Sequence, residues 1–248
     1  PVGGALLLTG DSDRLSIGVA ALGAVTTVLA WRLIPQRGEF TPEEPPGRGS
    51  FGVIRRDGAF LLFLVAMVLA HLVYFAYEAV LPISAVDSYG LSPAAWGFLV
   101  IINPALVTIF QLRLTRRVER FPAAPKFALA MILMGWPFLL LSVNASIAIL
   151  ALVILIFVVG EMLWIPTSQA IAAGLAPADL RGAYMGAFSS TSSVGFALGP
   201  FLGLQVRGEF GDSAMWGFFA GAAVVGAVLG VIACRYAFEI RKARLAAA

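Results

Sequence analysis

The chain has 248 residues, of which 60% are hydrophobic and 12% are charged, and its formal net charge is +3. This composition excludes an ordinary water-soluble domain and is typical of a protein that crosses a membrane several times. The single cysteine, Cys234, excludes an intrachain disulfide and resembles neither a metal site nor a catalytic nucleophile.

Seven apolar stretches are long enough to cross a bilayer, which takes ~20 residues in a helix. In chain order they cover residues 15–34, 59–84, 93–115, 125–144, 146–173, 182–206 and 213–238. Only residues 142–146 separate the fourth stretch from the fifth, which predicts a tight hairpin there. We therefore predict an all-α integral membrane protein with about seven transmembrane helices.

The distribution of arginine and lysine predicts the orientation, because these residues accumulate on the cytoplasmic side of a membrane. If the chain begins outside, every one of its 17 Lys and Arg residues falls on the cytoplasmic side except Arg14 and Arg207. The positive net charge is then a consequence of topology. It carries no argument for nucleic acid as a partner.

The one sizeable connection between spans covers residues 35–57 and is rich in proline, glycine and glutamate. Such a composition is typical of a linker, here on the cytoplasmic side. It divides the chain into residues 1–34 and residues 58–248, and the second part holds six spans that could form a bundle of their own. We expect the helix at 15–34 to sit apart from that bundle or only loosely against it.

The sixth span carries the pattern GxxxGPxxG, formed by Gly195, Gly199, Pro200 and Gly203. Glycines four apart lie on one helix face and let two membrane helices approach closely, and a proline bends the helix. A shortened copy at residues 1–4 repeats the P-x-x-G, so the chain looks like the end of one repeat followed by a whole second repeat. A tight packing seam without further function is the alternative.

A run of five hydroxyl residues, 189–193, lies in the same span. Serines in a membrane helix usually bond backbone carbonyls of their own helix and soften it. A direct role in binding a ligand is the less favoured alternative.

Charged groups inside the apolar spans are few. Burying a charge in a membrane costs free energy, so each such group is a candidate for a functional role. They are Glu78, Glu161 and, when protonated, His71. His71, Tyr74 and Glu78 stand at i, i+3 and i+7, which places them on one helix face that should point into the bundle or a central cavity. A histidine hydrogen-bonded to a neighbouring helix backbone is the alternative for His71.

Glu161 shares a helix face with Trp164, and no Lys or Arg lies within a span to pair with it. It lies near the middle of its span, with Gly160 and Pro166 close by to allow backbone flexing. We therefore prefer it to Glu78 as a group that carries a coupled proton. A plain hydrogen bond across helices is the alternative.

The span at 93–115 has a mixed face made by Trp96, Asn103 and Phe110, at spacings of seven. This face either lines a site or packs against a neighbour.

No phosphate loop, HExxH or GxSxG motif occurs in the sequence, so we expect neither an enzyme nor a cofactor or metal.

The layout resembles the C-terminal half of a major facilitator superfamily transporter, preceded by the end of helix five and all of helix six of the N-terminal half. Residues 1–4 look like the tail of the family's helix-five signature GPxxGG, which is associated with proton-coupled antiporters, and residues 195–203 echo it in helix eleven. Ala5 and Leu204 replace the final glycines. The family's loop signature GxxxDRxGRR corresponds to residues 111–120, where its glycine and aspartate are missing.

Gly160-Glu161, followed by Pro166 and by residues 181–186, is similar to the drug:proton antiporter branch of this family. The resemblance implies a fragment of a twelve-helix transporter in the cell membrane, of the kind found in the bacterial inner membrane. Two six-helix bundles would enclose a site at mid-membrane and rock around it. The implied partners are a small-molecule substrate, protons, the lipid bilayer and the missing N-terminal half of the same protein.

We therefore predict a proton-coupled exporter of small, lipophilic, often cationic molecules, because unpaired acids in the spans favour a cation over an anion. The substrate and proton pathway would use Glu161, Glu78, His71, Tyr74, Asn103 and Trp164. Symport of a neutral solute is one alternative, and a non-transport receptor or scaffold is another. A retinal-type receptor would need a lysine in mid-helix, whereas Lys126 and Lys242 lie at the cytoplasmic edges.

Overall fold

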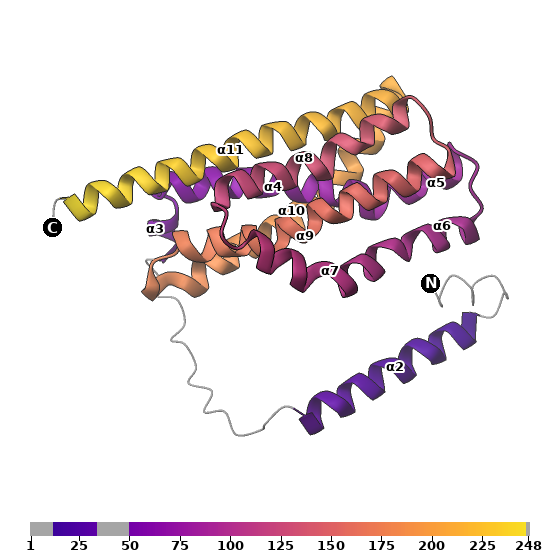
Figure 1. Ribbon diagram of the computed structural model, residues 1–248, viewed down its shortest axis with the longest axis horizontal. Coiled ribbons are helices and arrows are strands. Elements are labelled where there is room, and N and C mark those ends of the chain that lie inside the picture. The colour runs from indigo at the N-terminus through magenta and orange to yellow at the C-terminus, as the bar shows by residue number, and fades with distance from the viewer. Residues whose placement is uncertain (1–11, 34–49, 247–248) are drawn as a thin grey trace.

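The computed structural model describes residues 12–33 and 50–246, which are helical over most of their length and contain no strand (Figure 1). The α-helices are α2 (Ser12–Leu33), α3 (Ser50–Ile54), α4 (Gly58–Phe75), α5 (Leu81–Asp87), α6 (Pro93–Val100), α7 (Ile102–Val118), α8 (Ala123–Gly135), α9 (Ile147–Leu175), α10 (Arg181–Phe210) and α11 (Asp212–Ala246). The predicted all-α class is confirmed.

Five helical stretches of the described chain are long and apolar enough to cross a membrane. They are Gly58–Asp87, Pro93–Val118, Ala123–Ser142, Ile147–Leu175 and Asp212–Ala237. Each coincides with a predicted span to within a few residues. The other two predicted spans fall on α2 and α10, which are helices of 22 and 30 residues but are not among these five. The hydroxyl run, glycines and proline of α10 lower its mean hydropathy.

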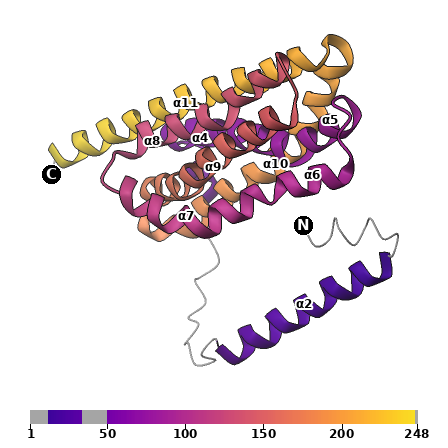
Figure 2. The same cartoon turned by 45° about the vertical axis from the view of Figure 1, so that its right-hand side comes forward.

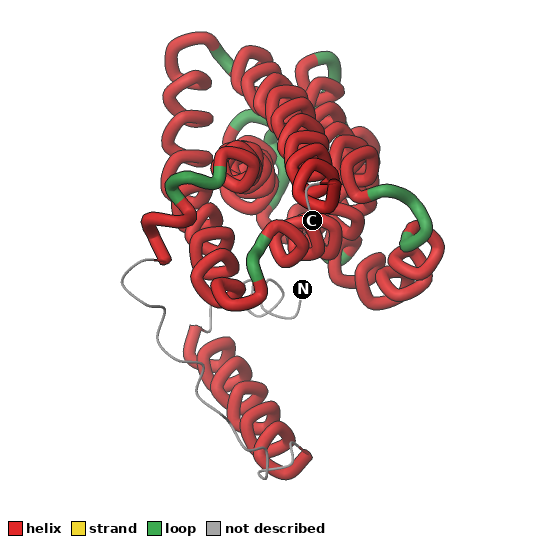
Figure 3. Tube along the Cα trace, turned by 90° about the vertical axis from the view of Figure 1, so that its left-hand side faces the viewer, coloured by secondary structure: helices red, strands yellow, loops and turns green. Residues whose placement is uncertain are grey.

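The helices from α4 onward pack into one bundle (Figure 3). Within it α4 lies against both α10 and α11. On the other side α8 packs against α9 and α11, and α7 packs along α9. Buried aromatic rings fill much of the interior, among them Phe63, Phe127, Phe138, Phe157 and Trp216. Since lipid is as apolar as these side chains, close packing rather than exclusion of water holds such a bundle together.

Helix α2 stands apart from this bundle in every view (Figure 2). The side chains of α2 that the structure describes are exposed, and the exposed fraction is 67% for Ile17 and 70% for Trp31. The division of the chain at residues 35–57 stays a prediction, because residues 34–49 lie outside the described ranges. The shortened motif at residues 1–4 lies outside them as well.

The first spanning stretch is interrupted by a π-helical turn, Ala76–Val80, between α4 and α5. Pro82 has no N–H to give to the carbonyl four residues earlier, and its ring crowds that turn. The N–H of Leu81 instead reaches back five residues to the carbonyl of Ala76. Such π turns widen a helix locally and are frequent at functional sites.

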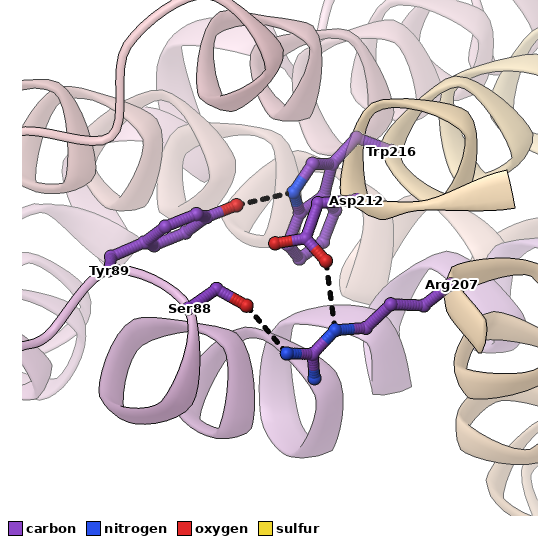
Figure 4. A network of polar contacts seen from close by, with 5 residues as sticks. All are labelled: Ser88, Tyr89, Arg207, Asp212 and Trp216. Atoms are coloured by element: carbon purple, nitrogen blue, oxygen red, sulfur yellow. Dashed lines mark hydrogen bonds and ion pairs between the residues drawn. The ribbon is translucent and has the colours of Figure 1, made fainter.

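A polar network joins the ends of α5, α10 and α11 at the predicted outer face (Figure 4). Arg207 Nε donates to Asp212 Oδ1 at 2.8 Å, and its Nη2 donates to the hydroxyl of Ser88. Trp216 Nε1 donates to Tyr89 Oη at 2.7 Å. Burial raises the pKa of the Tyr89 hydroxyl, so this group stays neutral at physiological pH. The network therefore fixes the turn between α10 and α11 on the end of α5.

Replacing Asp212 by asparagine should weaken this network, since the ion pair with Arg207 is lost while the side-chain shape is kept. The pair is about a quarter exposed, so screening limits the expected loss of unfolding free energy to about 1 kcal/mol. Thermal unfolding in detergent is the measurement. Glu209→Gln is the matched control, because it removes an exposed carboxylate from the same turn. Equal stability of the two variants would contradict the prediction.

Candidate functional site

A cavity of about 300 Å³ lies between the α4–α5 stretch, the α6–α7 stretch and α9. Its walls are formed by Tyr74, Tyr77, Glu78, Pro82, Trp96, Val100, Asn103, Pro104 and Glu161. It contains both carboxyl groups that the sequence places inside spans. Elsewhere the wall is mainly aromatic and aliphatic, a mixture typical of sites for small molecules.

Glu161 is the more buried of the two acids, with 7% of the residue exposed. Its Oε2 accepts a hydrogen bond of 2.8 Å from Nδ2 of Asn103, which brings α9 and α7 together. Further along α7, Gln111 Nε2 donates to the backbone carbonyl of Met162, the residue after Glu161, at 3.1 Å. Asn103 therefore fixes one oxygen of the Glu161 carboxyl and leaves the other oxygen free of that bond.

Glu78 reaches the same cavity from the π turn of the first spanning stretch, and its side chain is exposed. Pro82, which causes the turn, lines the cavity beside it. The extra residue in the turn changes the direction of every side chain that follows it. Sequence reasoning selected Glu78 but missed the π turn, for which Pro82 was the available signal.

Tyr74 and Tyr77 line the cavity, and they pack against Trp164 and Phe157, which do not line it themselves. The ring of Tyr74 lies 5.6 Å from that of Trp164 and 6.3 Å from that of Phe157, measured between centroids. Tyr77 stacks on Phe157 at 4.2 Å, and its buried hydroxyl has no partner in the described part of the chain. Aromatic faces attract cations, so rings next to carboxyl groups suit a positively charged, partly apolar ligand.

His71 does not line this cavity, although it shares α4 with Tyr74. Its Nδ1 lies 2.9 Å from the carbonyl of Met67 and 3.1 Å from Oγ1 of Thr191 on α10. The carbonyl can only accept, so Nδ1 carries the hydrogen and Nε2 remains available for a proton. The ring meets Trp164 edge-on at 5.0 Å. The predicted stripe thus divides between the cavity and the α4–α10 contact.

The glycines of α10 face two different neighbours. A methyl group at Gly195 would collide with Cβ of His71, and one at Gly199 would lie 3.1 Å from the carbonyl oxygen of Leu72. One at Gly203 would lie 2.5 Å from the ring of Phe219 on α11. All three glycines are buried, whereas Pro200 between them is half-buried. Side chains larger than hydrogen would therefore separate α10 from α4 and α11.

The hydroxyl run of α10 bonds partly to its own helix. Ser190 Oγ donates to the carbonyl of Gly186 at 2.9 Å, and Thr191 Oγ1 donates to that of Phe188 at 2.6 Å.

The mixed face predicted from Trp96, Asn103 and Phe110 divides, since the helix is interrupted between α6 and α7. The first two residues line the cavity, and Phe110 is 44% exposed away from it.

Comparison with known proteins gives one family and several distant relatives. The model of the Major Facilitator Superfamily matches residues 1–200. A "Na(+), Li(+), K(+)/H(+) antiporter" of Planococcus maritimus is 23% identical over 164 residues, which cover 60% of this chain and 39% of that protein. "Multidrug resistance protein MdtH" of Klebsiella pneumoniae is 27% identical over 210 residues, or 84% of this chain and 49% of that protein.

A solved structure with a similar fold is that of a POT family transporter in complex with a thioalcohol-conjugated peptide. The two agree with a TM-score of 0.62 at 18% sequence identity, over 94% of this chain and 51% of that one. The chain therefore spans about half the length of the relatives it matches.

Proposed function

The chain belongs to the major facilitator superfamily, and on this premise we propose that it works as the C-terminal half of a secondary active transporter, not of an enzyme. The protein would export small lipophilic or cationic compounds from the cell across the inner membrane in exchange for protons. Two bundles rocking about a site between them would give alternating access. Its partners would be the substrate, protons, the surrounding lipid and the N-terminal half.

The observation that carries this proposal is the cavity that holds Glu161 and Glu78 beside aromatic rings. In a membrane interior an acid without a basic partner is costly, which favours occupation by a proton or a cation. Tyr74, Tyr77 and Trp96 add the ring faces that an organic cation needs. An anionic substrate would meet like charge here.

The geometry supports competition between a proton and a cation at Glu161. Asn103 holds Oε2, so the carboxyl keeps its orientation whether or not it is charged. A proton bound there would remove the charge that holds the cation, and a bound cation would disfavour the proton. Two ligands that exclude each other at one site are the minimum requirement for exchange across a membrane.

Two alternative functions make different demands on the cavity. A symporter of a neutral solute would bind substrate and proton together, and a receptor or scaffold would carry neither across. The cavity favours exchange of a cation, because ring faces beside carboxyl groups attract a positive charge, whereas a neutral solute would leave the carboxyl groups to the proton alone. One of the relatives named above is called a Na(+), Li(+), K(+)/H(+) antiporter, which is consistent with exchange of a cation for protons.

We expect proteoliposomes holding the complete transporter to accumulate an aromatic quaternary ammonium ion when the lumen is acidic. Protons leaving the lumen would drive the cation inward, and a permanent charge prevents trapping of the compound as a weak base. Protein-free vesicles with the same gradient are the control. Accumulation of a neutral solute in an alkaline lumen would instead show symport, and no response to either gradient would exclude transport coupled to protons.

A further inference from the structure

A second and larger recess, of about 890 Å³, lies at the end of the bundle where α4 and α10 begin, whereas the network of Arg207 lies where α5 and α10 end. It is formed where α4 and α10 begin, where α9 ends and near the end of the membrane span in α11. It shares no residue with the cavity around Glu161. From the distribution of basic residues this is the cytoplasmic end of the spans.

Arg56 is the basic side chain in the wall of this recess. The neighbouring acid, Asp57, is already occupied on both oxygens: Oδ1 accepts from the backbone N–H of Phe60 and Oδ2 from Tyr184 Oη, each at 3.0 Å. Within the described ranges the guanidinium of Arg56 makes no hydrogen bond or ion pair, and its side chain is exposed. Arg56 therefore lines the recess without an ion-pair partner in the described ranges, while each oxygen of Asp57 already accepts a hydrogen bond.

The rest of the wall is largely apolar, and it leaves open space beside Arg56. Val53 and Tyr236 line the recess and are 46% and 52% exposed. Gly174, also in the wall, has nothing within 4 Å of the position that a Cβ would take. Tyrosines at helix ends are typical of the headgroup level of a membrane, where a polar group and an acyl chain meet.

We propose that this recess binds the phosphate of an anionic phospholipid from the cytoplasmic leaflet, with Arg56 on the phosphate and an acyl chain along Val53 and Tyr236. Exposed arginines at the same end, among them Arg55 and Arg181, would raise the local concentration of such lipids. A soluble phosphate would contact a single arginine and would make no favourable contact with the apolar part of the wall. A phospholipid can contact both parts of the surface, the arginine with its phosphate and the apolar side chains with an acyl chain.

The test is binding of phosphatidylglycerol to the full chain in detergent, followed by native mass spectrometry, against phosphatidylcholine with the same acyl chains. We expect a preference for phosphatidylglycerol that Arg56→Ala weakens roughly tenfold, the effect of losing a charged hydrogen bond. Arg55→Ala is the matched control, since it removes the same charge one residue away but does not line the recess. Gly174→Leu should also weaken binding, because it fills the recess and leaves the charge unchanged.

Equal losses in the Arg55 and Arg56 variants would overturn the proposal, because they would indicate general attraction to a basic surface. Equal binding of the two lipids would overturn it as well. Displacement of phosphatidylglycerol by an equal concentration of inorganic phosphate or glycerol 3-phosphate would show a site for soluble anions instead. Loss in Arg56→Ala and Gly174→Leu, with neither soluble anion competing, is the result that supports a lipid.

Discussion

Glu161→Gln should abolish accumulation driven by a pH gradient while the transporter still exchanges substrate across the membrane. A gradient of two pH units is worth about 2.7 kcal/mol per proton, so one-for-one exchange could concentrate a cation up to about a hundredfold. The glutamine variant should stay near an accumulation ratio of about one, since glutamine resembles a permanently protonated acid. Exchange should continue because Glu78 and the aromatic wall remain.

This substitution separates coupling from folding because of the contact that Glu161 makes. Asn103 Nδ2 donates to a side-chain oxygen of Glu161, and the amide oxygen of glutamine can accept the same hydrogen bond. The α7–α9 contact should therefore survive, and the melting temperature should change little. If Glu161 had only this structural role, the variant would accumulate substrate as the wild type does, and our assignment would be wrong.

The measurement is uptake of a labelled quaternary ammonium ion into proteoliposomes, with and without an acidic lumen. Glu119→Gln serves as the matched control, because it neutralises an exposed carboxyl at the end of α7, far along the chain from the cavity walls. It should accumulate substrate like the wild type. An equal loss in both variants would point to a general effect of charge.

The sequence alone was sufficient for the helical class and for five spans, because apolar length determines both. It also singled out Glu161 and Asn103, since polar side chains are rare in spans and each needs a reason. Their meeting at 2.8 Å could not be predicted, because it depends on how α7 and α9 are rotated about their axes. Hydropathy carries no information on rotation when a helix is apolar on nearly all sides.

The stripe of His71, Tyr74 and Glu78 shows a second limit. Tyr74 and Glu78 both line the cavity although a π turn begins between them, whereas His71, one turn before Tyr74 in α4, does not line it. His71 also contacts α10 through Thr191, a residue far away in sequence. Only the close approach permitted by Gly195 makes that contact, and this approach depends on tertiary packing.

Gly195→Ala should be the most destabilising of the small substitutions in α10. The added methyl group would collide with Cβ of His71 and lie 2.9 Å from its carbonyl carbon, so α4 and α10 would have to separate. Overpacking of this kind costs about 3 kcal/mol, which corresponds to a fall of roughly 5 °C or more in melting temperature.

Gly186→Ala is the matched control for this prediction, because it makes the same change in the same helix where nothing lies within 4 Å of the new methyl group. Alanine favours a helix over glycine by about 1 kcal/mol, so this variant should be as stable as the wild type or slightly more stable. Thermal unfolding of both proteins in one detergent provides the comparison. Because helix propensity favours alanine equally at both positions, a lower melting temperature in Gly195→Ala alone must come from the contact with α4. Equal melting temperatures would mean that α10 does not approach His71 this closely.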